Sequence, residues 1–212
     1  MKLPISLPDE GVLFVVSGPS GVGKSTVVNR AMERIPGLSF SVSATTRAPR
    51  EGEQDLVDYC FLSNDEFQEL LAQDAFLEHA PVYDHWYGTR RAPVDEALAG
   101  GRSLILDIDV QGARQGRQRL PQAVHIIIVP PSIEALEQRL RHRGTDDAVT
   151  ISRRMKKVAQ QLQPVSEYDY VVVNDRLEAA VAVFEGILLA EMHRRSRRGG
   201  QVAAIQRQLR VS

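Results

Sequence analysis

Cysteine is almost missing from this chain, because Cys60 is the only one among its 212 residues. A single cysteine cannot close a disulfide within the chain, and it cannot supply the several thiolates of a cysteine-built metal cluster. A small, partly buried side chain is the usual role of such a residue. We therefore expect the fold to form without covalent cross-links, as in proteins of reducing compartments.

Long apolar runs are missing as well. The opening residues, MKLPISLPDEGVLFVV, contain prolines and charges around a short apolar stretch, and they lack the small-residue cleavage site of a signal peptide. No apolar run approaches the roughly 18 residues that a membrane-spanning helix needs. These absences predict a cytoplasmic protein with no membrane partner.

An excess of either charge is the third absence. Lysine and arginine total 26 and aspartate and glutamate total 27, which leaves a formal net charge of -1. Such a balance gives no bulk attraction to nucleic acid, so nucleic acid is not an expected partner. Any site for an anion must come from a local cluster of arginine and lysine.

What the chain does contain is an alternation of two kinds of segment. Short runs rich in aliphatic residues predict buried strands at 12–17, 103–110, 124–129 and 168–174. Longer amphipathic stretches predict helices at 24–35, 91–99, 132–143, 147–162 and 176–195. Strands that alternate with helices, and are apolar on both faces, indicate an α/β fold with a parallel core sheet flanked by helices.

Two segments interrupt this alternation. Residues 40–90 are rich in polar side chains and combine short strand-like pieces with a helix near 64–73, which Ser63 or Asn64 would cap. This composition predicts a mixed α+β insertion between the first helix and the second core strand. Residues 139–165 are highly charged and helical, and we expect them to form a mobile lid.

A phosphate-binding motif directly follows the first predicted strand. The segment GPSGVGKS matches G-x-x-x-x-G-K-[ST] without a gap. Its glycines let successive N–H groups point at phosphate oxygens, and the next helix presents its positive N-terminus to the same anion. A chance glycine-rich turn is the alternative, but it does not explain the strand before and the helix after. The predicted nucleoside triphosphate site comprises Gly18, Pro19, Ser20, Gly21, Val22, Gly23, Lys24, Ser25 and Thr26, with Lys24 at the β- and γ-phosphates and Ser25 at Mg²⁺.

That motif leaves open whether the phosphoryl acceptor is water, a protein or a small molecule. The inserted segment begins with SVSATTRAPR, residues 41–50. Arg47 and Arg50 each carry a planar guanidinium fork, and two such forks can face one phosphate. Tyr59 and Tyr87 add hydroxyl donors. This cluster indicates an acceptor that already carries a phosphate.

One carboxylate, Glu78, stands in the apolar and aromatic stretch FLEHAPVYDHWYGT, which ends at Thr89. A buried carboxylate needs paired donors, or its burial costs several kcal/mol. Guanine offers two adjacent donors, N1–H and the 2-amino group, and its O6 can accept from Thr89. Adenine lacks both donors and would leave Glu78 unpaired, so the pair favours a guanine base.

These motifs together give the chain its family resemblance. The matching stretches are SGPSGVGKST, SVSATTRAPREGE with the later DYCF, FLEHA, YGT, ILDIDVQGA, PPSIEALEQRLRHRGTDD and VVVND, and they span residues 17–175. With them the chain resembles the bacterial guanylate kinases. The resemblance implies a P-loop nucleoside-monophosphate-kinase fold and a Mg²⁺-dependent transferase of purine nucleotide metabolism that makes ADP and GDP from ATP and GMP. The implied parts are a P-loop core (1–42, 92–138 and 166–212), a GMP-binding insertion (43–91) and a lid (139–165).

The resemblance also implies a role for each matching residue of the GMP site. It places the phosphate of GMP against Arg47, Arg50, Tyr59 and Tyr87. It has guanine read by Ser43, Glu78, Thr89 and Asp107. Asp109 would lie on the same strand face as Asp107 and bind either the base or waters of Mg²⁺. The remaining hydroxyls, Ser41, Thr45 and Thr46, are expected only to satisfy the backbone of the turn.

On the ATP side the resemblance implies four catalytic residues, Lys24, Arg139, Arg143 and Arg154, the three arginines closing from the lid. Asn174 would lie near the adenosine. Some positions depart from the pattern of the family. Leu56 stands where glycine is common, His85-Trp86 replaces Asn-Tyr, and Gln161 replaces a glutamate that would orient Arg154.

Two other functions are compatible with parts of the sequence. A related kinase for a sugar phosphate would use the same ATP site without the guanine-reading pair. A non-catalytic module that binds protein partners would not need Lys24 and both acceptor arginines, which are intact here. The basic segment RRSRRGG at 194–200 is expected to be a solvated helix end. The long final helix is compatible with contact between copies of the chain, so a homo-oligomer is a hypothesis.

Overall fold

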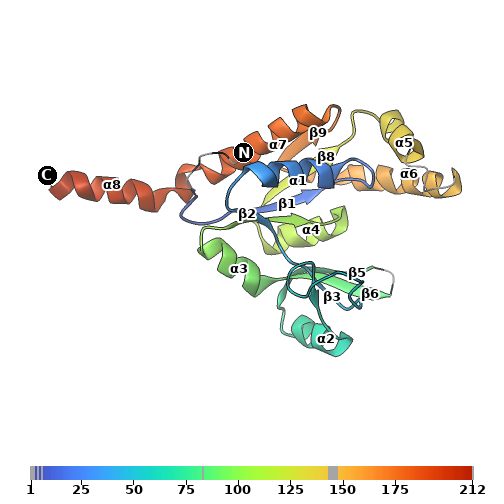
Figure 1. Cartoon of the computed structure of the whole chain (residues 1–212), viewed down its shortest axis with the longest axis horizontal. Coiled ribbons are helices and arrows are strands. Elements are labelled where there is room, and N and C mark those ends of the chain that lie inside the picture. Colours follow the sequence, from blue (N-terminus) through green and yellow to red (C-terminus); the bar gives the residue numbers. More distant parts are fainter. Residues whose placement is uncertain (1–2, 4, 6, 83, 143–147, 212) are drawn as a thin grey trace.

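The structure of the chain, a computed structural model, describes residues 3, 5, 7–82, 84–142 and 148–211 (Figure 1). Its main sheet contains parallel strands in the order β2-β7-β1-β8-β9. The bounds of these strands are β1 (Leu13–Ser17), β2 (Leu38–Phe40), β7 (Ser103–Asp107), β8 (Val124–Val129) and β9 (Tyr170–Val173). The predicted α/β fold with a parallel core sheet is confirmed.

Helices cover both faces of this sheet, and strand β1 shows why. The alternate residues of a strand point to opposite faces. Phe14 and Val16 pack on the side of α1 (Lys24–Arg34) and α7 (Leu177–Met192), whereas Leu13 and Val15 pack on the side of α3 (Arg91–Ala99) and α4 (Val110–Arg119). Every residue of β1 is therefore buried, and the strand reads as a continuous apolar run in the sequence.

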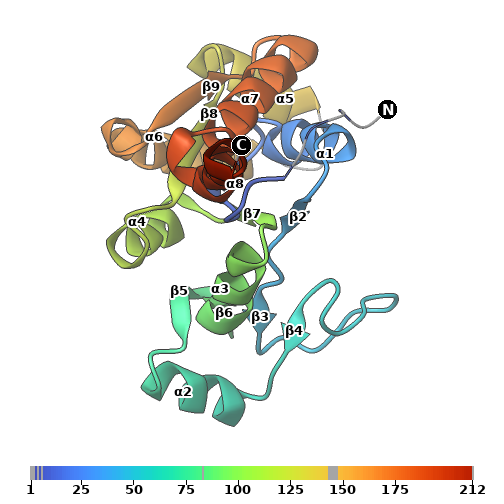
Figure 2. The same cartoon turned by 90° about the vertical axis from the view of Figure 1, so that its left-hand side faces the viewer.

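A smaller sheet lies below the main one in Figure 2 and comes from the inserted segment. Its strand order is β4-β3-β6-β5, and β5 and β6 form an antiparallel hairpin. Its elements are β3 (Ala44–Thr45), β4 (Cys60–Phe61), α2 (Asn64–Ala72), β5 (Phe76–Val82) and β6 (His85–Arg90). Between the two predicted caps of α2 the structure selects Ser63, whose hydroxyl accepts from the Glu66 N–H in a capping box.

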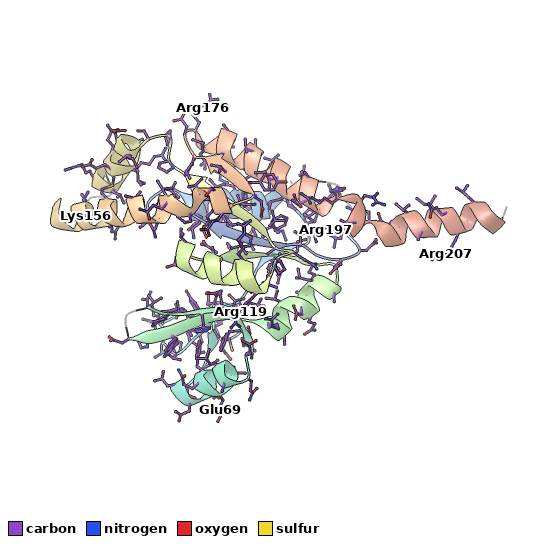
Figure 3. The ribbon with its side chains drawn as sticks, turned by 180° about the vertical axis from the view of Figure 1, so that it is seen from behind. Glu69, Arg119, Lys156, Arg176, Arg197 and Arg207 are labelled. Carbon is purple, nitrogen blue, oxygen red and sulfur yellow. The ribbon has the colours of Figure 1, made fainter. Side chains whose placement is uncertain are left out.

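The smaller sheet has its own apolar core. Phe67 of α2 stacks on Phe76 of β5 with ring centroids 4.4 Å apart, and Trp86 completes the stack at 5.9 Å from Phe67. Cys60 is buried in this core, as expected for a lone cysteine. Arg119, labelled between α4 and this sheet in Figure 3, ties the two sheets together because its Nη1 donates to Asp74 Oδ1 and to the Phe76 carbonyl, both at 2.6 Å.

Two further helices lie beside the carboxyl edge of the main sheet. These helices, α5 (Ile133–His142) and α6 (Ala148–Leu162), pack on each other through Leu136, Leu140 and Val158. A short 3-10 helix, η1 (Gln163–Glu167), then returns the chain to β9. The helical character that the sequence predicts for this segment is confirmed in its described residues.

The elements that were not predicted include β2, α4 and α8, and one predicted strand is too long. The strand predicted at 103–110 ends at Asp107, because α4 already begins at Val110. The prediction missed α4 because its sequence, VQGARQGRQR, has two glycines and little apolar character. It missed β2 because a strand of three residues gives almost no periodic signal.

The third missed element is α8 (Gly199–Val211), which extends away from the body of the molecule (Figure 1). The prediction that the basic segment at 194–200 is the end of a helix is therefore wrong. Helix α7 ends at Met192, a short 3-10 helix η2 (Arg195–Arg197) follows, and α8 begins at Gly199. The Gly200 N–H donates to Asp9 Oδ2 at 2.7 Å at the base of α8. No helix within the described part of the chain is long and apolar enough to cross a membrane.

Candidate active site at the carboxyl edge of the sheet

The predicted ATP-site residues and Asp107 lie where the parallel strands of the main sheet end. The glycine-rich loop follows β1, Asp107 is the last residue of β7, and Asn174 directly follows β9. Ligands of open α/β sheets bind at this edge. A cavity of about 600 Å³ opens near the amino ends of the strands, between Leu13, Leu98 and Leu120. None of its described lining residues is a predicted site residue, so the carboxyl edge is the candidate site.

The glycine-rich loop leads into a helix whose first N–H groups have no side-chain cap. Gly21 and Gly23 adopt φ angles of +87° and +89°, a region that favours glycine. A Cβ at Gly23 would also lie only 2.6 Å from Asn174 Nδ2. Gly23 is the N-cap of α1 and forms no side-chain cap hydrogen bond. The N-terminus of α1 can therefore donate to an anion, as the motif predicts.

Asn174 lies against this loop. Its Nδ2 donates to the Val22 carbonyl at 2.7 Å, and only 6% of the residue is exposed. A cleft of about 440 Å³ opens beside it, lined by Gly21, Val22, Gly23, Thr26, Arg139, Asn174, Asp175 and Leu177. The structure thus brings the loop, Asn174 and Arg139 together around one cleft.

Two of the three arginines predicted to act from a lid, Arg139 and Arg154, lie in the described part of the chain. Arg139 projects from α5, and its Nη2 donates to the Asp175 carbonyl at 3.2 Å. Arg154 is half-buried on α6, the same helix that carries Gln161. Arg143 lies outside the described residues. Leu140 of α5 comes so close to the loop that a Cβ at Gly21 would meet its Cδ2 at 2.6 Å.

Lys24 is the cation at the centre of this edge. Its Nζ forms an ion pair with Asp107 Oδ1. Burial lowers the pKa of Lys24 to about 8, and the charge of Asp109 partly opposes that effect. The ammonium group is thus held by carboxylates next to the loop, where a phosphate group can also reach it.

The same edge suits a magnesium ion that arrives with a nucleotide. The described residues contain no group of three or more His, Cys, Asp or Glu side chains that could hold a metal alone. Donors that suit Mg²⁺ are nonetheless present in Ser25, whose residue is exposed, and in the carboxylates of Asp107 and Asp109. Since Mg²⁺ is usually held by one or two carboxylates together with substrate phosphates, these residues fit it.

Three of the four residues predicted to hold the acceptor phosphate, Arg47, Tyr59 and Tyr87, lie close together beside the smaller sheet, whereas Arg50 is exposed. Arg47 Nη2 donates to Glu53 Oε1 at 2.8 Å, and its guanidinium carbon lies 5.4 Å from the centre of the Tyr59 ring. The rings of Tyr59 and Tyr87 lie 6.0 Å apart. The hydrogen bond with Glu53 raises the pKa of Arg47, with Tyr87 contributing in the same direction. Arg47, Tyr59 and Tyr87 therefore form one cluster around a fixed guanidinium.

Glu53 is a residue that the sequence reasoning missed. Its Oε2 accepts from the Arg50 backbone N–H at 2.7 Å while its Oε1 holds Arg47, so it fixes both ends of the turn. The signal was an acidic residue three positions after Arg50. The hydroxyls of Thr45 and Thr46 accept from the N–H groups of Arg47 and Trp86, which confirms that they satisfy the backbone.

Glu78 and Thr89 form a buried pair. The Thr89 hydroxyl donates to Glu78 Oε1 at 2.7 Å. Glu78 is 6% exposed and Thr89 is 0% exposed. Burial raises the pKa of Glu78, and the hydrogen bond from Thr89 opposes that shift. Thr89 has a single hydroxyl proton, so the predicted interaction with guanine O6 requires that proton to leave Glu78. Ser43, half-buried, directly precedes β3 in the same sheet.

The two predicted aspartates, Asp107 and Asp109, lie in different parts of the backbone. Asp109 is not on a strand face, since β7 ends at Asp107; it sits in the turn before α4, where its Oδ1 accepts from the Gly112 N–H at 2.8 Å. Asp107 forms an ion pair with Lys24, whereas the negative charge of Asp109 raises the pKa of both Lys24 and Glu78. Ser17 Oγ donates to the Ile108 carbonyl at 3.0 Å and so holds this turn against β1, a contact that the sequence did not reveal.

Comparison with known proteins gives the relatives of this chain. A family model described as guanylate kinase matches residues 10–191. A guanylate kinase from Desulfitobacterium hafniense is 46% identical over 190 residues, which cover 90% of this chain and 95% of that protein. One from Koribacter versatilis is 49% identical over 189 residues, 88% of this chain and 81% of that protein. The crystal structure of guanylate kinase from Anaplasma phagocytophilum matches with a TM-score of 0.71 and 34% identity, covering 95% of this chain and 96% of that chain.

Proposed function

This chain belongs to the guanylate kinase family, and from that premise we propose how its residues carry out the reaction. It is a nucleoside monophosphate kinase that transfers the γ-phosphoryl group of ATP to GMP, giving ADP and GDP. The observation that carries the residue assignment is that the fold contains two separate groups of donors suited to bind phosphate. The uncapped α1 loop with Lys24 provides one, and the Arg47–Tyr59–Tyr87 cluster provides the other.

We assign the ATP phosphates to the loop from Gly18 to Thr26. Lys24 neutralises the β- and γ-phosphates, and Asn174 borders the adenosine side of the cleft. The Ser25 hydroxyl would hold Mg²⁺, and Asp107 or Asp109 would accept hydrogen bonds from the water molecules bound to the ion. When bound, the ion supplies charge that neutralises the transferring phosphoryl group. No other step depends on it.

The acceptor half holds GMP through its phosphate and its base. Arg47, Arg50, Tyr59 and Tyr87 donate to the phosphate, and the ion pair with Glu53 keeps the Arg47 fork in place. Glu78 accepts from guanine N1–H and the 2-amino group, with Ser43, Thr89 and Asp107 around the base. The finding that supports this assignment is that the Glu78 carboxyl is buried and accepts from the Thr89 hydroxyl at one of its two oxygens, Oε1.

Catalysis in this arrangement is mainly positioning and charge stabilisation. The second pKa of a phosphate monoester is about 6, so GMP is largely a dianion at neutral pH and its oxygen is already a nucleophile. The protein therefore needs no general base. Lys24 and the lid arginines Arg139, Arg143 and Arg154 stabilise the charge that spreads over the phosphoryl group in a loose transition state.

The division of labour along the chain is part of the proposal. Residues 1–42, 92–138 and 166–212 would bind ATP, residues 43–91 would bind GMP, and residues 139–165 would close over both. The separate smaller sheet and the packing of α5 on α6 support this division. Closure of the lid would exclude water and suppress hydrolysis of ATP.

An acceptor screen tests the function directly. Purified, folded protein with Mg-ATP is given GMP, AMP, CMP, UMP or a sugar phosphate, and the phosphorylated product of each acceptor is measured. GMP is expected to be the preferred acceptor by a wide margin, since adenine leaves Glu78 unpaired. Absence of GDP under conditions where the protein is folded contradicts the proposal, and turnover of the sugar phosphate alone would favour the other kinase class.

Two broader predictions remain to be tested. Association of copies is supported by Val202, Ile205 and Leu209 of α8, which are 44%, 60% and 73% exposed. Light scattering of the full chain beside a chain ending at Arg198 decides this, since only the full chain would associate. A cytoplasmic location stays a prediction from the sequence, and fractionation of cells that express the chain measures it.

A further inference from the structure

Gly112, near the start of α4, lies where two carboxylates of the site meet. A Cβ built at Gly112 would lie 3.0 Å from Glu78 Oε2 and 3.5 Å from Asp109 Oδ1. The backbone N–H of Gly112 donates to that same Asp109 oxygen at 2.8 Å. Gly112 is buried, and its α-carbon therefore forms part of the wall behind both carboxylates.

The position of Glu78 is fixed from its other side. Thr89 donates to Oε1 at 2.7 Å, and the residue is only 6% exposed, so the carboxylate has little freedom to rotate away. Oε2 is the oxygen that faces Gly112, whereas the Thr89 hydroxyl donates to Oε1. A side chain at position 112 must therefore push Oε2, and the push acts on the oxygen left for a ligand.

Conformational freedom does not explain a glycine here. Gly112 is outside the left-handed region, unlike Gly21 and Gly23. Within a helix, glycine is less stable than alanine by roughly 0.5–1 kcal/mol. The local backbone would accept alanine readily, so the feature that distinguishes glycine at this position is the space that it leaves for Glu78.

We propose that Gly112 is a positioning residue for GMP: by lacking a side chain, it sets the place of Glu78 Oε2, and its N–H holds Asp109 beside it. This inference rests on the proposed role of Glu78 in binding guanine. Hydrogen bonds to a base are sensitive to displacements of a few tenths of an ångström, because their strength falls steeply as distance and angle depart from the optimum. Gly112 thereby controls GMP recognition without touching GMP.

A double-mutant cycle tests this role. The variant G112A should raise the KM for GMP by about five- to twentyfold, with kcat and the KM for ATP within about threefold of the wild type. Gly186→Ala is the matched control, because Gly186 lies in α7 and a Cβ there meets nothing within 4 Å. That control should leave both KM values unchanged.

The second arm of the cycle is E78D, which shortens the side chain and withdraws the carboxylate from position 112. E78D alone should weaken GMP use, but G112A should add little in the E78D background, since the crowding is relieved there. Equal fold-losses from G112A in both backgrounds would overturn the proposal. If G112A alone fails to fold, the double variant decides: it should fold again, and failure of both would also overturn the proposal.

The cycle also separates this inference from the proposed function. If the wild type forms no GDP from GMP, the function itself fails before any variant is compared. If the wild type is active and Glu78→Gln abolishes GMP use, the base site stands. If G112A then has the same effect in the wild-type and E78D backgrounds, only the proposed role of Gly112 is rejected.

Discussion

Replacement of Glu78 by glutamine tests the centre of the acceptor site with almost no change in shape. The carboxylate offers two acceptor oxygens, and Thr89 already occupies one position on Oε1 at 2.7 Å. Glutamine keeps one oxygen and replaces the other with an amide that can only donate. If its oxygen keeps Thr89, the amide faces a guanine donor, and a favourable contact becomes an unfavourable one.

The size of the effect follows from those groups. A hydrogen bond to a charged group contributes about 1.5–3 kcal/mol, and an unmatched buried donor adds a further penalty of about 1–3 kcal/mol. A loss of roughly 3–4 kcal/mol corresponds to a fall of about 10²- to 10³-fold in kcat/KM for GMP. The KM for ATP should stay within about twofold, because Glu78 belongs to the smaller sheet, whereas Lys24 and Asn174 follow strands of the main sheet.

The stability of the Glu78→Gln variant, unlike its kcat/KM for GMP, should increase or stay constant. Burial raises the pKa of Glu78, which means that the folded state disfavours the ionised form relative to the unfolded chain. Glu78→Gln removes that penalty at neutral pH, so the denaturation midpoint should be equal to that of the wild type or higher. Steady-state kinetics with GMP varied, together with a urea titration, measure both. A stable variant with unchanged kcat/KM for GMP would refute the role of Glu78.

Three further predictions concern other parts of the structure. Because burial lowers the pKa of Lys24 to about 8, the affinity of the free enzyme for Mg-ATP should fall as pH rises through that value, which calorimetry at several pH values measures; a flat profile contradicts the assignment. Leu56 has a φ of 61°, so Leu56→Gly should stabilise the fold by up to about 1 kcal/mol in urea unfolding, whereas Leu56→Ala should give no gain. Burial lowers the pKa of His125 to about 4, so the unfolded chain binds the extra proton and stability falls as pH drops below about 6.5; His125→Leu should reduce that loss between neutral and mildly acidic pH.

The parts of the site that the sequence predicts are those carried by short contiguous motifs. The loop from Gly18 to Ser25 has a fixed spacing because its backbone must surround a phosphate, so the letters alone indicate the geometry. The turn with Arg47 and Arg50 is likewise local. Leu56 is a useful case: the sequence marks it as a departure from a glycine pattern, and its positive φ gives the physical reason why glycine suits that position.

Contacts between segments that are distant along the chain could not be predicted from the sequence. The Thr89–Glu78 bond depends on the register of the β5–β6 hairpin, in which Glu78 pairs with Thr89. The approach of Gly112 to Glu78 depends on how α4 packs against β5, and the pairing of Lys24 with Asp107 depends on strand order. None of these distances follows from spacing along the chain, because each is set by tertiary packing.

The smaller sheet has an apolar core of its own on one face, whereas Leu77 of β5 packs in a core cluster of the main sheet, and this arrangement has a consequence for how the molecule opens. The core around Phe67, Phe76 and Trp86 shares no residue with the clusters that hold the main sheet. Cooperative unfolding units usually coincide with such independently packed motifs. The outer elements α2, β3 and β4 can therefore open while the main sheet and β5 remain packed together, and native-state hydrogen exchange should resolve two units, the outer elements first and the main sheet with β5 second. GMP would slow exchange in the first unit and ATP in the second, so that each substrate stabilises a different part of the same chain.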